Sequence, residues 1–340
     1  MLSLDVSLTP SHQAREWTDA LRELRCDVFS FPGWVRAAVH LGDSSAILLV
    51  ARAGTQCLAA LPLLVRPITG GHEDVASPYG YPGLCQRPGI DTQVLAEVLR
   101  AMCGKLTERG FVSCFIRGNP LLESMSDLGI GQVVHHGSTV SVNLLKPSES
   151  RLADLASGHR YEIRRTAAAG IDVRPTDTDE AWAAFRELYG SAMRRLGASA
   201  DYFWSDAHWM QLRTMAREGE ASLLMAFDAD EPLGGALFLH LPGSGIVHYH
   251  LAASTRERRK LQPAKLILWE AQKHFFQLGY SVLHLGGGFG GRADSLFQFK
   301  AGFSPERHRF FTRRIVLDES AYRALTGDKQ TEFFPAYRAL

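Results

Sequence analysis

The sequence predicts an α/β protein built from two tandem copies of one unit. The order strand, strand, long helix, glycine, strand occurs twice, and the two helix-ending glycines, Gly110 and Gly279, lie about 170 residues apart. The chain has 340 residues, a length typical of two domains. It is 46% hydrophobic and 21% charged, which is ordinary for a globular protein with sizeable cores. The composition therefore excludes a disordered or low-complexity chain.

The elements of the first copy follow from local patterns. The segments AILLVAR and LAALPLLVR are typical of strands, and a short turn at Gly54 joins them. Asp91 is placed to cap a helix with apolar residues at helical spacing. The segment FVSCFIR follows Gly110 as a further strand.

The second copy repeats this order. The segments ASLLMAF, LGGALFLHL and IVHYHLAA are predicted strands, a helix begins near Pro263, and SVLHL is the next strand. The pattern is interrupted at residues 146–150. We therefore expect one domain over residues 1–147 and a second over residues 148–340.

Charge is balanced overall but clustered locally. With 37 Lys and Arg against 36 Asp and Glu, the formal net charge is +1, so the chain is no general polyanion binder. A predicted basic helix over residues 152–169 contains HRYEIRR, and a second basic cluster covers residues 256–260. Either cluster is an anion site, with phosphates as its target, or a solvated basic face.

Other classes of site find little support. Five cysteines without paired spacing predict no disulfide framework. His248 and His250 alternate on a predicted strand and so share one side, but no third metal ligand has suitable spacing, so wall histidines are expected. The N-terminus does not resemble a signal peptide, and no apolar stretch suffices to span a membrane. We expect a cytoplasmic protein.

The glycine-rich segment GGGFGG (286–291) follows a predicted strand. It satisfies G-x-G-x-x-G formally, but the expected acidic residue about 20 positions later is missing, which argues against a dinucleotide site. The glycines instead predict close approach of the backbone to a ligand or a neighbouring strand. In the short helix that follows, capped by Asp294 or Ser295, Lys300 lies on an apolar face. It either extends its ammonium into water or serves as a partly desolvated cation facing developing negative charge.

The sequence contains no G-x-S-x-G elbow, H-E-x-x-H motif or Walker loop. Since it offers no nucleophile, it favours direct attack by a substrate amine. The segments HLGGG and DSLFQFKAGFSP resemble the C-terminal hallmark of Fem-like proteins, tandem-domain members of the GNAT acyltransferase superfamily. The segments SPYGYPG, HRYEIRR, LYGSAMRRLGASADYFW and HYHLAAS agree with this resemblance, which covers about residues 45–315. It implies two tandem GNAT-like domains, each a mixed, mostly antiparallel sheet with flanking helices, and a cleft between them.

The resemblance also implies roles for individual residues. Lys300 with Phe299 matches a phenylalanine–lysine pair whose lysine stabilises charge during acyl transfer. Arg195 matches a basic residue that helps to hold substrate phosphates. The expected substrate-binding residues are Tyr79, Tyr81, Arg195, Tyr202, His248 and His250.

Family members of this kind move an amino acid from a charged tRNA onto an amine. We therefore expect an aminoacyltransferase that forms an amide bond on a peptidoglycan precursor or a natural-product intermediate, with aminoacyl-tRNA as co-substrate and no bound cofactor or metal. Acyl-CoA is disfavoured because the segment RERRKLQP lacks the glycines that cradle its pyrophosphate. Two alternatives remain: an acyl-CoA-dependent N-acyltransferase, and a non-catalytic GNAT-like binding protein of an envelope or export pathway. The expected donor-phosphate residues are Arg160, Arg164, Arg256, Arg258, Arg259 and Lys260.

Overall fold

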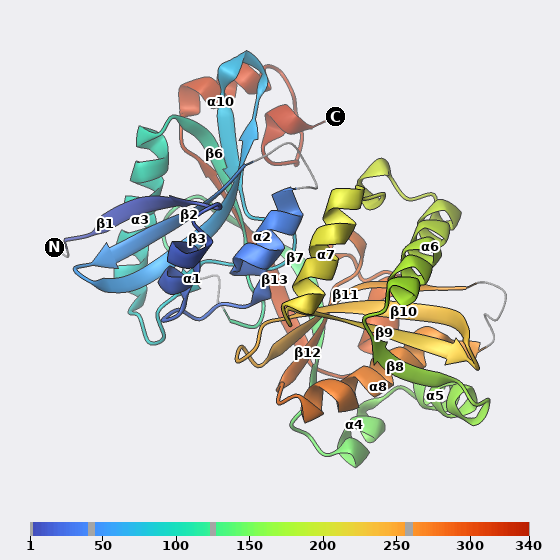
Figure 1. Cartoon of the computed structure of the whole chain (residues 1–340). Helices are drawn as coiled ribbons and strands as arrows, with labels where there is room; N and C mark the ends of the chain where they lie inside the picture. Colours follow the sequence, from blue (N-terminus) through green and yellow to red (C-terminus); the bar gives the residue numbers. More distant parts are fainter. Residues whose placement is uncertain (1–2, 40–44, 123–126, 256–260, 340) are drawn as a thin grey trace. The chain divides into compact units, whose positions relative to one another are not determined.

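The chain forms two compact units in a computed structural model that describes residues 3–39, 45–122, 127–255 and 261–339 (Figure 1). Unit 1 consists of Met1–His136 and Arg309–Leu340, and unit 2 consists of Gly137–His308. Each unit has a mixed, mostly antiparallel sheet with helices packed on it, as the sequence predicts.

The sheet of unit 1 has the strand order β1-β2-β3-β4-β6-β13, with β5 paired to β3. Strands β4 and β6 are parallel, and the connection between them includes the long helix α3. The other pairs along this order are antiparallel. The strands are β1 (Asp5–Pro10), β2 (Ser45–Ala53), β3 (Gln56–Pro67), β4 (Glu73–Ala76), β5 (Cys85–Gln86), β6 (Phe111–Arg117) and β13 (Arg307–Val316).

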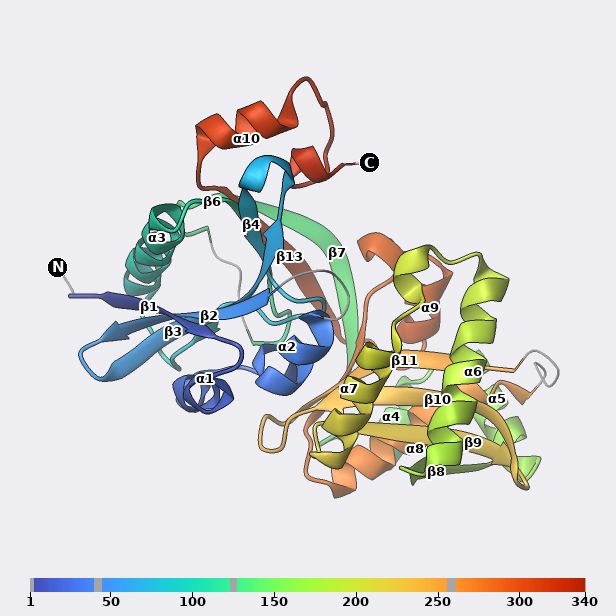
Figure 2. The ribbon, with the colours of Figure 1, turned by 45° about the horizontal axis from the view of Figure 1, so that its top comes forward.

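Helices cover both faces of this sheet (Figure 2). On one face, α3 (Thr92–Glu108) buries Val98 and Met102 in a core shared with the strands. It begins as predicted at Asp91, whose Oδ1 accepts from the backbone N–H groups of the first turn. On the other face, α1 (Ala14–Leu21) and α2 (Pro32–Val39) contribute to a second core. Helix α10 (Glu319–Thr326) follows β13.

The sheet of unit 2 has the order β7-β12-β11-β10-β9-β8. Strands β11 and β12 are its parallel pair, and helix α8 lies between them in sequence, so the arrangement repeats that of β4, α3 and β6. The internal repeat predicted from the sequence is therefore present. The strands are β7 (Gln132–Asn143), β8 (Asp172–Thr176), β9 (Ala221–Asp228), β10 (Glu231–His240), β11 (Ile246–Ser254) and β12 (Val282–Gly286).

Unit 2 is also layered. Helix α8 packs with α5 over one face of the sheet, where Val247, Leu283 and Phe275 share a core. Helices α6 and α7 pack over the other face, and Gly235 is needed there because a Cβ would lie 2.8 Å from the Phe185 ring. The helices of unit 2 are α4 (Ser148–Asp154), α5 (Ser157–Ala168), α6 (Asp179–Leu196), α7 (Asp206–Arg217), α8 (Pro263–Gln277) and α9 (Ser295–Ala301). Short 3₁₀ helices are η1 (Val28–Ser30), η2 (Thr69–Gly71), η3 (Ala200–Tyr202), η5 (Phe289–Gly291) and η6 (Ala336–Arg338).

The division into units differs from the predicted domains 1–147 and 148–340. The break lies at residues 136/137, and residues 309–340 return to unit 1. The return occurs because β13 pairs with β6, from Thr312 opposite Arg117 onwards. Near the C-terminus, Arg338 Nε donates to the buried carboxylate of Asp74 at 2.7 Å, which holds this segment against β4.

The predicted basic helix over residues 152–169 is wrong as one element, because α4 ends at Asp154 and α5 begins at Ser157. Leu155 and Ala156 between them have extended ψ angles of 141° and 144°. Helix α8 begins at Pro263 and α9 is capped by Asp294, both as predicted. Within the described residues, no helix is long and apolar enough to cross a membrane.

Candidate active site

The parallel pair β11 and β12 is joined over a short length. The paired residues are Ile246 to His248 with Val282 to His284, although β11 continues to Ser254 and β12 to Gly286. Gly286 has φ = 77°, which turns the chain out of β12 into the glycine-rich segment. Backbone groups of β11 beyond His248 therefore do not receive their ladder bonds from β12. Side chains placed at the end of β12 can therefore lie beside the part of β11 that follows His248.

Lys300 is one such group. It lies in the last turn of α9 and is 9% exposed, and its Nζ donates to the carbonyl oxygen of Gly287, directly after β12, at 2.7 Å. Burial lowers the pKa of Lys300 to about 8, and the carboxylate of Asp294 acts in the opposite direction. The hypothesis that Lys300 extends its ammonium into water is thus wrong. The ammonium is still mostly protonated at pH 7, but it is poorly hydrated.

Asp294 fixes the geometry around this lysine. Its carboxylate caps α9 by accepting from Phe297 N at 2.9 Å and also accepts from Phe289 N in the glycine-rich segment at 3.0 Å. Gly288 is required there, because a Cβ would lie 2.4 Å from Asp294 Oδ1. The glycines also permit approach to a strand, since a Cβ at Gly287 would lie 3.1 Å from a carbonyl oxygen of β7. The predicted close approach of the backbone is confirmed for a neighbouring strand.

The segments HRYEIRR and FQFKAGF, far apart in sequence, pack together. His159 Nε2 lies 2.9 Å from the carbonyl oxygen of Phe299, and its ring contacts Phe299 and Phe303 at centroid distances of 5.7 and 4.7 Å. A Cβ at Gly302 would lie 2.5 Å from the imidazole of His159. Helix α5 therefore holds the short helix that carries Lys300. This positioning role of His159 was not predicted from the sequence.

Histidines line the sheet beside this site. The Nδ1 atoms of His248 and His284 are 3.1 Å apart, and both side chains are buried. The pKa of His284 is well below its ordinary value, first because of burial and then because of the charges of His248, Lys300 and His308. The partnership with His284 was missed, although its place in SVLHL, next to the glycine-rich segment, is a visible signal.

The second predicted histidine, His250, belongs to an aromatic wall. Its ring stacks on Trp204 at a centroid distance of 5.9 Å, and Trp204 also stacks on Tyr189 of α6 at 5.3 Å. Burial lowers the pKa of His250 to about 3, so it is neutral at physiological pH. Tyr202 is half-buried in η3, two residues before Trp204. In the described parts of the chain, no group of three His, Cys, Asp or Glu is arranged to hold a metal ion.

The predicted phosphate-binding residues are dispersed. Arg195 is exposed in the last turn of α6. Arg160 donates to the carbonyl oxygen of Ala153 at 3.0 Å and so satisfies the end of α4, whereas Arg164 is exposed. The segment with Arg256, Arg258, Arg259 and Lys260 lies outside the described residues.

The aromatic loop of unit 1 is rigidly held. The backbone carbonyls of Tyr79 and Tyr81 accept from Trp34 Nε1 and Asn119 Nδ2, each at 2.8 Å. Tyr81 packs edge-on against Phe29 and Phe310. The Tyr79 side chain is 53% exposed.

Arg117 completes the surface of this loop. Its guanidinium lies over the Tyr79 ring at 5.3 Å, and its Nε donates to the carbonyl oxygen of Gly80 at 2.9 Å. The loop thus presents an aromatic ring and a cation together. Arg117 was missed because FVSCFIR was recognised only as a strand.

A comparison of the sequence with models of protein families finds a match. Residues 154–300 match the family model described as "Acetyltransferase (GNAT) domain". No curated protein matches the chain. The matched segment contains Lys300 and most of unit 2. This part of the chain is therefore similar to a GNAT acetyltransferase domain.

Similar solved structures extend the likeness to both units. A structure of FemX has a TM-score of 0.71 at 14% identity, covering 94% of this chain and 99% of its own. The C-terminal domain of a putative lysylphosphatidylglycerol synthetase from Agrobacterium fabrum has a TM-score of 0.56 at 12% identity, with 92% and 93% coverage. L-PGS from Bacillus licheniformis has a TM-score of 0.53 at 12% identity, with 88% and 91% coverage. In its fold the chain is a Fem-like tandem-GNAT protein, which confirms the resemblance stated from the sequence.

Proposed function

We propose that this protein is an aminoacyl-tRNA-dependent aminoacyltransferase that forms an amide bond on an amine acceptor. The observation that carries the proposal is the buried Lys300 ammonium, held at the end of β12 by the Gly287 carbonyl. Attack of an amine on the ester carbonyl forms the new C–N bond and develops negative charge on the carbonyl oxygen. The C–O bond of the ester then breaks, and the tRNA leaves with its terminal hydroxyl group, which takes up the proton that the amine loses. A poorly hydrated cation stabilises that charge more strongly than one in water, because little solvent must reorganise.

The ester of a charged tRNA is already activated, so the enzyme mainly has to orient donor and acceptor. The Fem-like fold supports this donor, as does the absence of glycine from the segment RERRKLQP. A second similar fold is that of the C-terminal domain of a putative lysylphosphatidylglycerol synthetase. Phosphate binding is assigned to Arg195 and to the two basic clusters.

The acceptor amine belongs to a peptidoglycan precursor or a natural-product intermediate. Contacts to the acceptor are assigned to Tyr79 and Tyr81, with Arg117 beside them. The histidines of β11 and the aromatic wall with Tyr202 would exclude water from the reacting ester. Charged tRNA places the reaction in the cytoplasm.

A second candidate, an acyl-CoA-dependent N-acyltransferase, is favoured by the description of the matching family model. Thermal shifts separate the two. Bulk bacterial tRNA charged with labelled amino acids is compared with deacylated tRNA and with acetyl-CoA. A ligand at 100 times its Kd stabilises the folded protein by about 2.7 kcal/mol. Stabilisation by acetyl-CoA alone would contradict the proposal, and no response to any of the three would favour a binding protein.

Transfer is then measured with the same labelled tRNA and a panel of primary amines, including lysine-containing peptides. Lys300→Met retains an unbranched apolar side chain but removes the charge, and we expect turnover to fall about 10²- to 10³-fold. Binding of charged tRNA should change little, because the interaction strengthens only in the transition state. Lys273→Met is the matched control, since Lys273 lies exposed on α8 and pairs with Glu270. Turnover of Lys300→Met equal to that of the control would refute the role of the lysine.

A further inference from the structure

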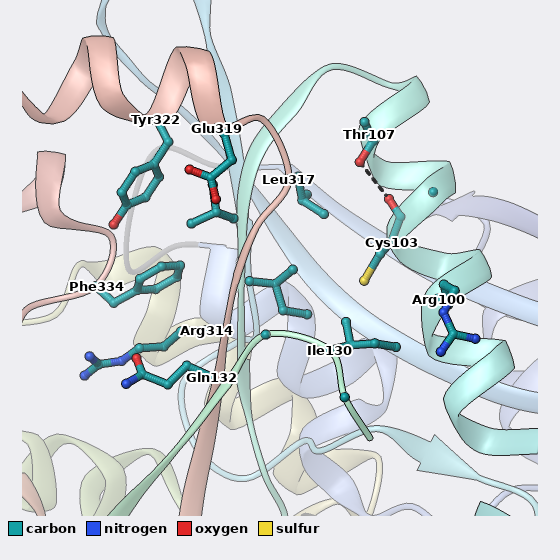
Figure 3. A pocket seen from close by; sticks show the side chains of 15 residues that line it. Arg100, Cys103, Thr107, Ile130, Gln132, Arg314, Leu317, Glu319, Tyr322 and Phe334 are labelled. Atoms are coloured by element: carbon teal, nitrogen blue, oxygen red, sulfur yellow. Dashed lines mark hydrogen bonds between the residues drawn. The ribbon is translucent and has the colours of Figure 1, made fainter. Parts of the chain in front are cut away.

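Unit 1 contains a cavity of about 830 Å³ that takes no part in the proposed reaction (Figure 3). Its walls come from α3, the segment 129–132, β13, and the chain from α10 to Phe334. A volume of this size suits a small organic molecule.

In the part of the chain that the structure describes, no acidic side chain forms an ion pair with the two arginines of the cavity lining. Arg314 of β13 is half-buried, and its Nε is fully buried without a hydrogen-bond partner among the described residues. Arg100 lines the opposite wall from α3 (Figure 3). The one acidic residue of the lining, Glu319, lies 3.6 Å from Arg323 on its own helix. Arg314 is only half-buried and lines the cavity, so an anionic ligand there would lie next to a cation that no acidic side chain of the described residues neutralises.

An aromatic surface adjoins Arg314. The guanidinium lies over the Phe334 ring at 5.9 Å, and Phe334 stacks on Tyr322 at a centroid distance of 5.9 Å. Tyr322 is held in place because its hydroxyl accepts from Ala336 N at 3.0 Å. Cys103 adds no charge, since burial raises the pKa of its thiol to about 11. The cavity therefore offers an apolar, partly aromatic wall next to a cation.

Two glycines give the cavity its shape. Gly131 has φ = 65°, and a Cβ there would lie 2.4 Å from the backbone oxygen of Arg314, so the segment 129–132 can lie directly on β13. Gly104 lies within α3, although alanine would make a helix more stable than glycine does. A Cβ at Gly104 would have no other atom within 4 Å. Neighbouring atoms therefore do not require glycine at 104, and the space beside it is open.

We propose that this cavity binds a small organic anion, a phosphate ester or carboxylate with an aromatic or branched apolar group. Arg314 binds the anionic group, Phe334 with Tyr322 packs on the apolar part, and Arg100 adds positive charge from the opposite wall (Figure 3). This site is separate from the proposed acyl-transfer site, and its test does not depend on the proposed function.

The test measures Kd values by ligand-observed ¹⁹F NMR with the full chain. The probes are 4-fluorophenyl phosphate and 4-fluorobenzoate, which distinguish the two anionic groups, and 4-fluorobenzyl alcohol as the neutral match. We expect at least one anion to bind at least about tenfold more tightly than the alcohol. Equal affinity for all three probes, or no binding of either anion at millimolar concentration, would overturn the proposal.

Variants locate the binding site. Arg314→Gln should weaken binding of the preferred anion by at least about tenfold. Arg100→Gln should weaken it by a smaller factor, because Arg100 is exposed on the opposite wall. Gly104→Phe should weaken binding by at least about tenfold, because the new ring takes up space in the cavity beside α3. Arg109→Gln removes the same charge from the exposed end of α3, outside the lining, and should leave Kd within about twofold. Arg100 is exposed, so its variant tests the site even if Arg314→Gln fails to fold. If Gly104→Phe binds the anion as tightly as the wild type, the ligand occupies another place and the proposal fails.

Discussion

Replacing Lys300 by Met should raise the stability of the protein at neutral pH while it abolishes most of its turnover. The pKa of Lys300 is lowered from 10.5 to about 8 by burial. A shift of this size corresponds to a penalty of roughly 3 kcal/mol for holding the charged form in the folded state below pH 8. Loss of the hydrogen bond to the Gly287 carbonyl offsets about 1 kcal/mol of this. The expected net gain in the free energy of unfolding at pH 7 is thus about 2 kcal/mol.

The pH dependence identifies the cause of this gain. The unfolded chain holds the lysine proton up to about pH 10.5, whereas the folded protein releases it near pH 8. Between these values the unfolded state binds more protons, so the stability of the wild type rises with pH. Lys300→Met lacks this rise. Its advantage should therefore be complete below pH 8 and should disappear as the pH approaches 10.5.

Urea unfolding followed by tryptophan fluorescence at pH 7 and pH 10 measures the effect. Trp182, Trp204, Trp209 and Trp269 all lie in unit 2 and report on its unfolding. Lys273→Met serves again as the control and should show no gain that depends on pH. If Lys300→Met is destabilised equally at both pH values, the Lys300 ammonium carries no desolvation penalty, and the electrostatic argument for its role is refuted.

Three further predictions concern other parts of the molecule. Gly302→Ala should lower the free energy of unfolding by about 1–3 kcal/mol, because the new methyl group collides with the imidazole of His159, which packs on α9. An unchanged midpoint of urea unfolding would mean that this contact is loose. Asp74→Asn should release the C-terminal segment and cost about 3–5 kcal/mol, because the neutral amide removes the charge paired with Arg66 and Arg338 and offers one acceptor oxygen in place of two. Limited proteolysis should then cleave after residue 326, and a protected C-terminus would disprove the role of Asp74 as an anchor. Neutralising Arg258, Arg259 and Lys260 together should make tRNA binding less dependent on salt. The slope of log K against log salt concentration should become shallower by about 0.7–1 for each lost phosphate contact. An unchanged slope would identify a solvated surface.

Features that depend on nearby residues could be predicted from the sequence. The caps at Asp91 and Asp294 and the start of α8 at Pro263 follow from side-chain chemistry within one helical turn. The repeated strand and helix order likewise gave the fold class. The break between α4 and α5 was missed, because Leu155 and Ala156 are both compatible with a helix and tertiary packing decides their conformation.

Long-range partners could not be predicted in the same way. No local signal in RFFTRRIV shows that it pairs with β6 almost 200 residues earlier, so the return of residues 309–340 to unit 1 was not anticipated. The burial of Lys300 depends on where the glycine-rich segment turns after β12, and spacing alone left two interpretations open. The contact of His159 with Phe299 joins segments 140 residues apart. Each of these features requires the tertiary structure.

During translation, residues 137–308 leave the ribosome before the residues that complete unit 1. Strands β1 to β6 are synthesised first, but β6 cannot pair with β13 until the last part of the chain has been synthesised. In that interval one edge of β6 offers unpaired backbone groups to any other strand, which makes the nascent chain vulnerable to mispairing and a client for chaperones. All the described strands and helices of unit 2 have been synthesised before β13 is complete. A chain that ends near residue 308 would therefore contain the helices and strands of unit 2 but would lack most of β13, which pairs with β6 in unit 1.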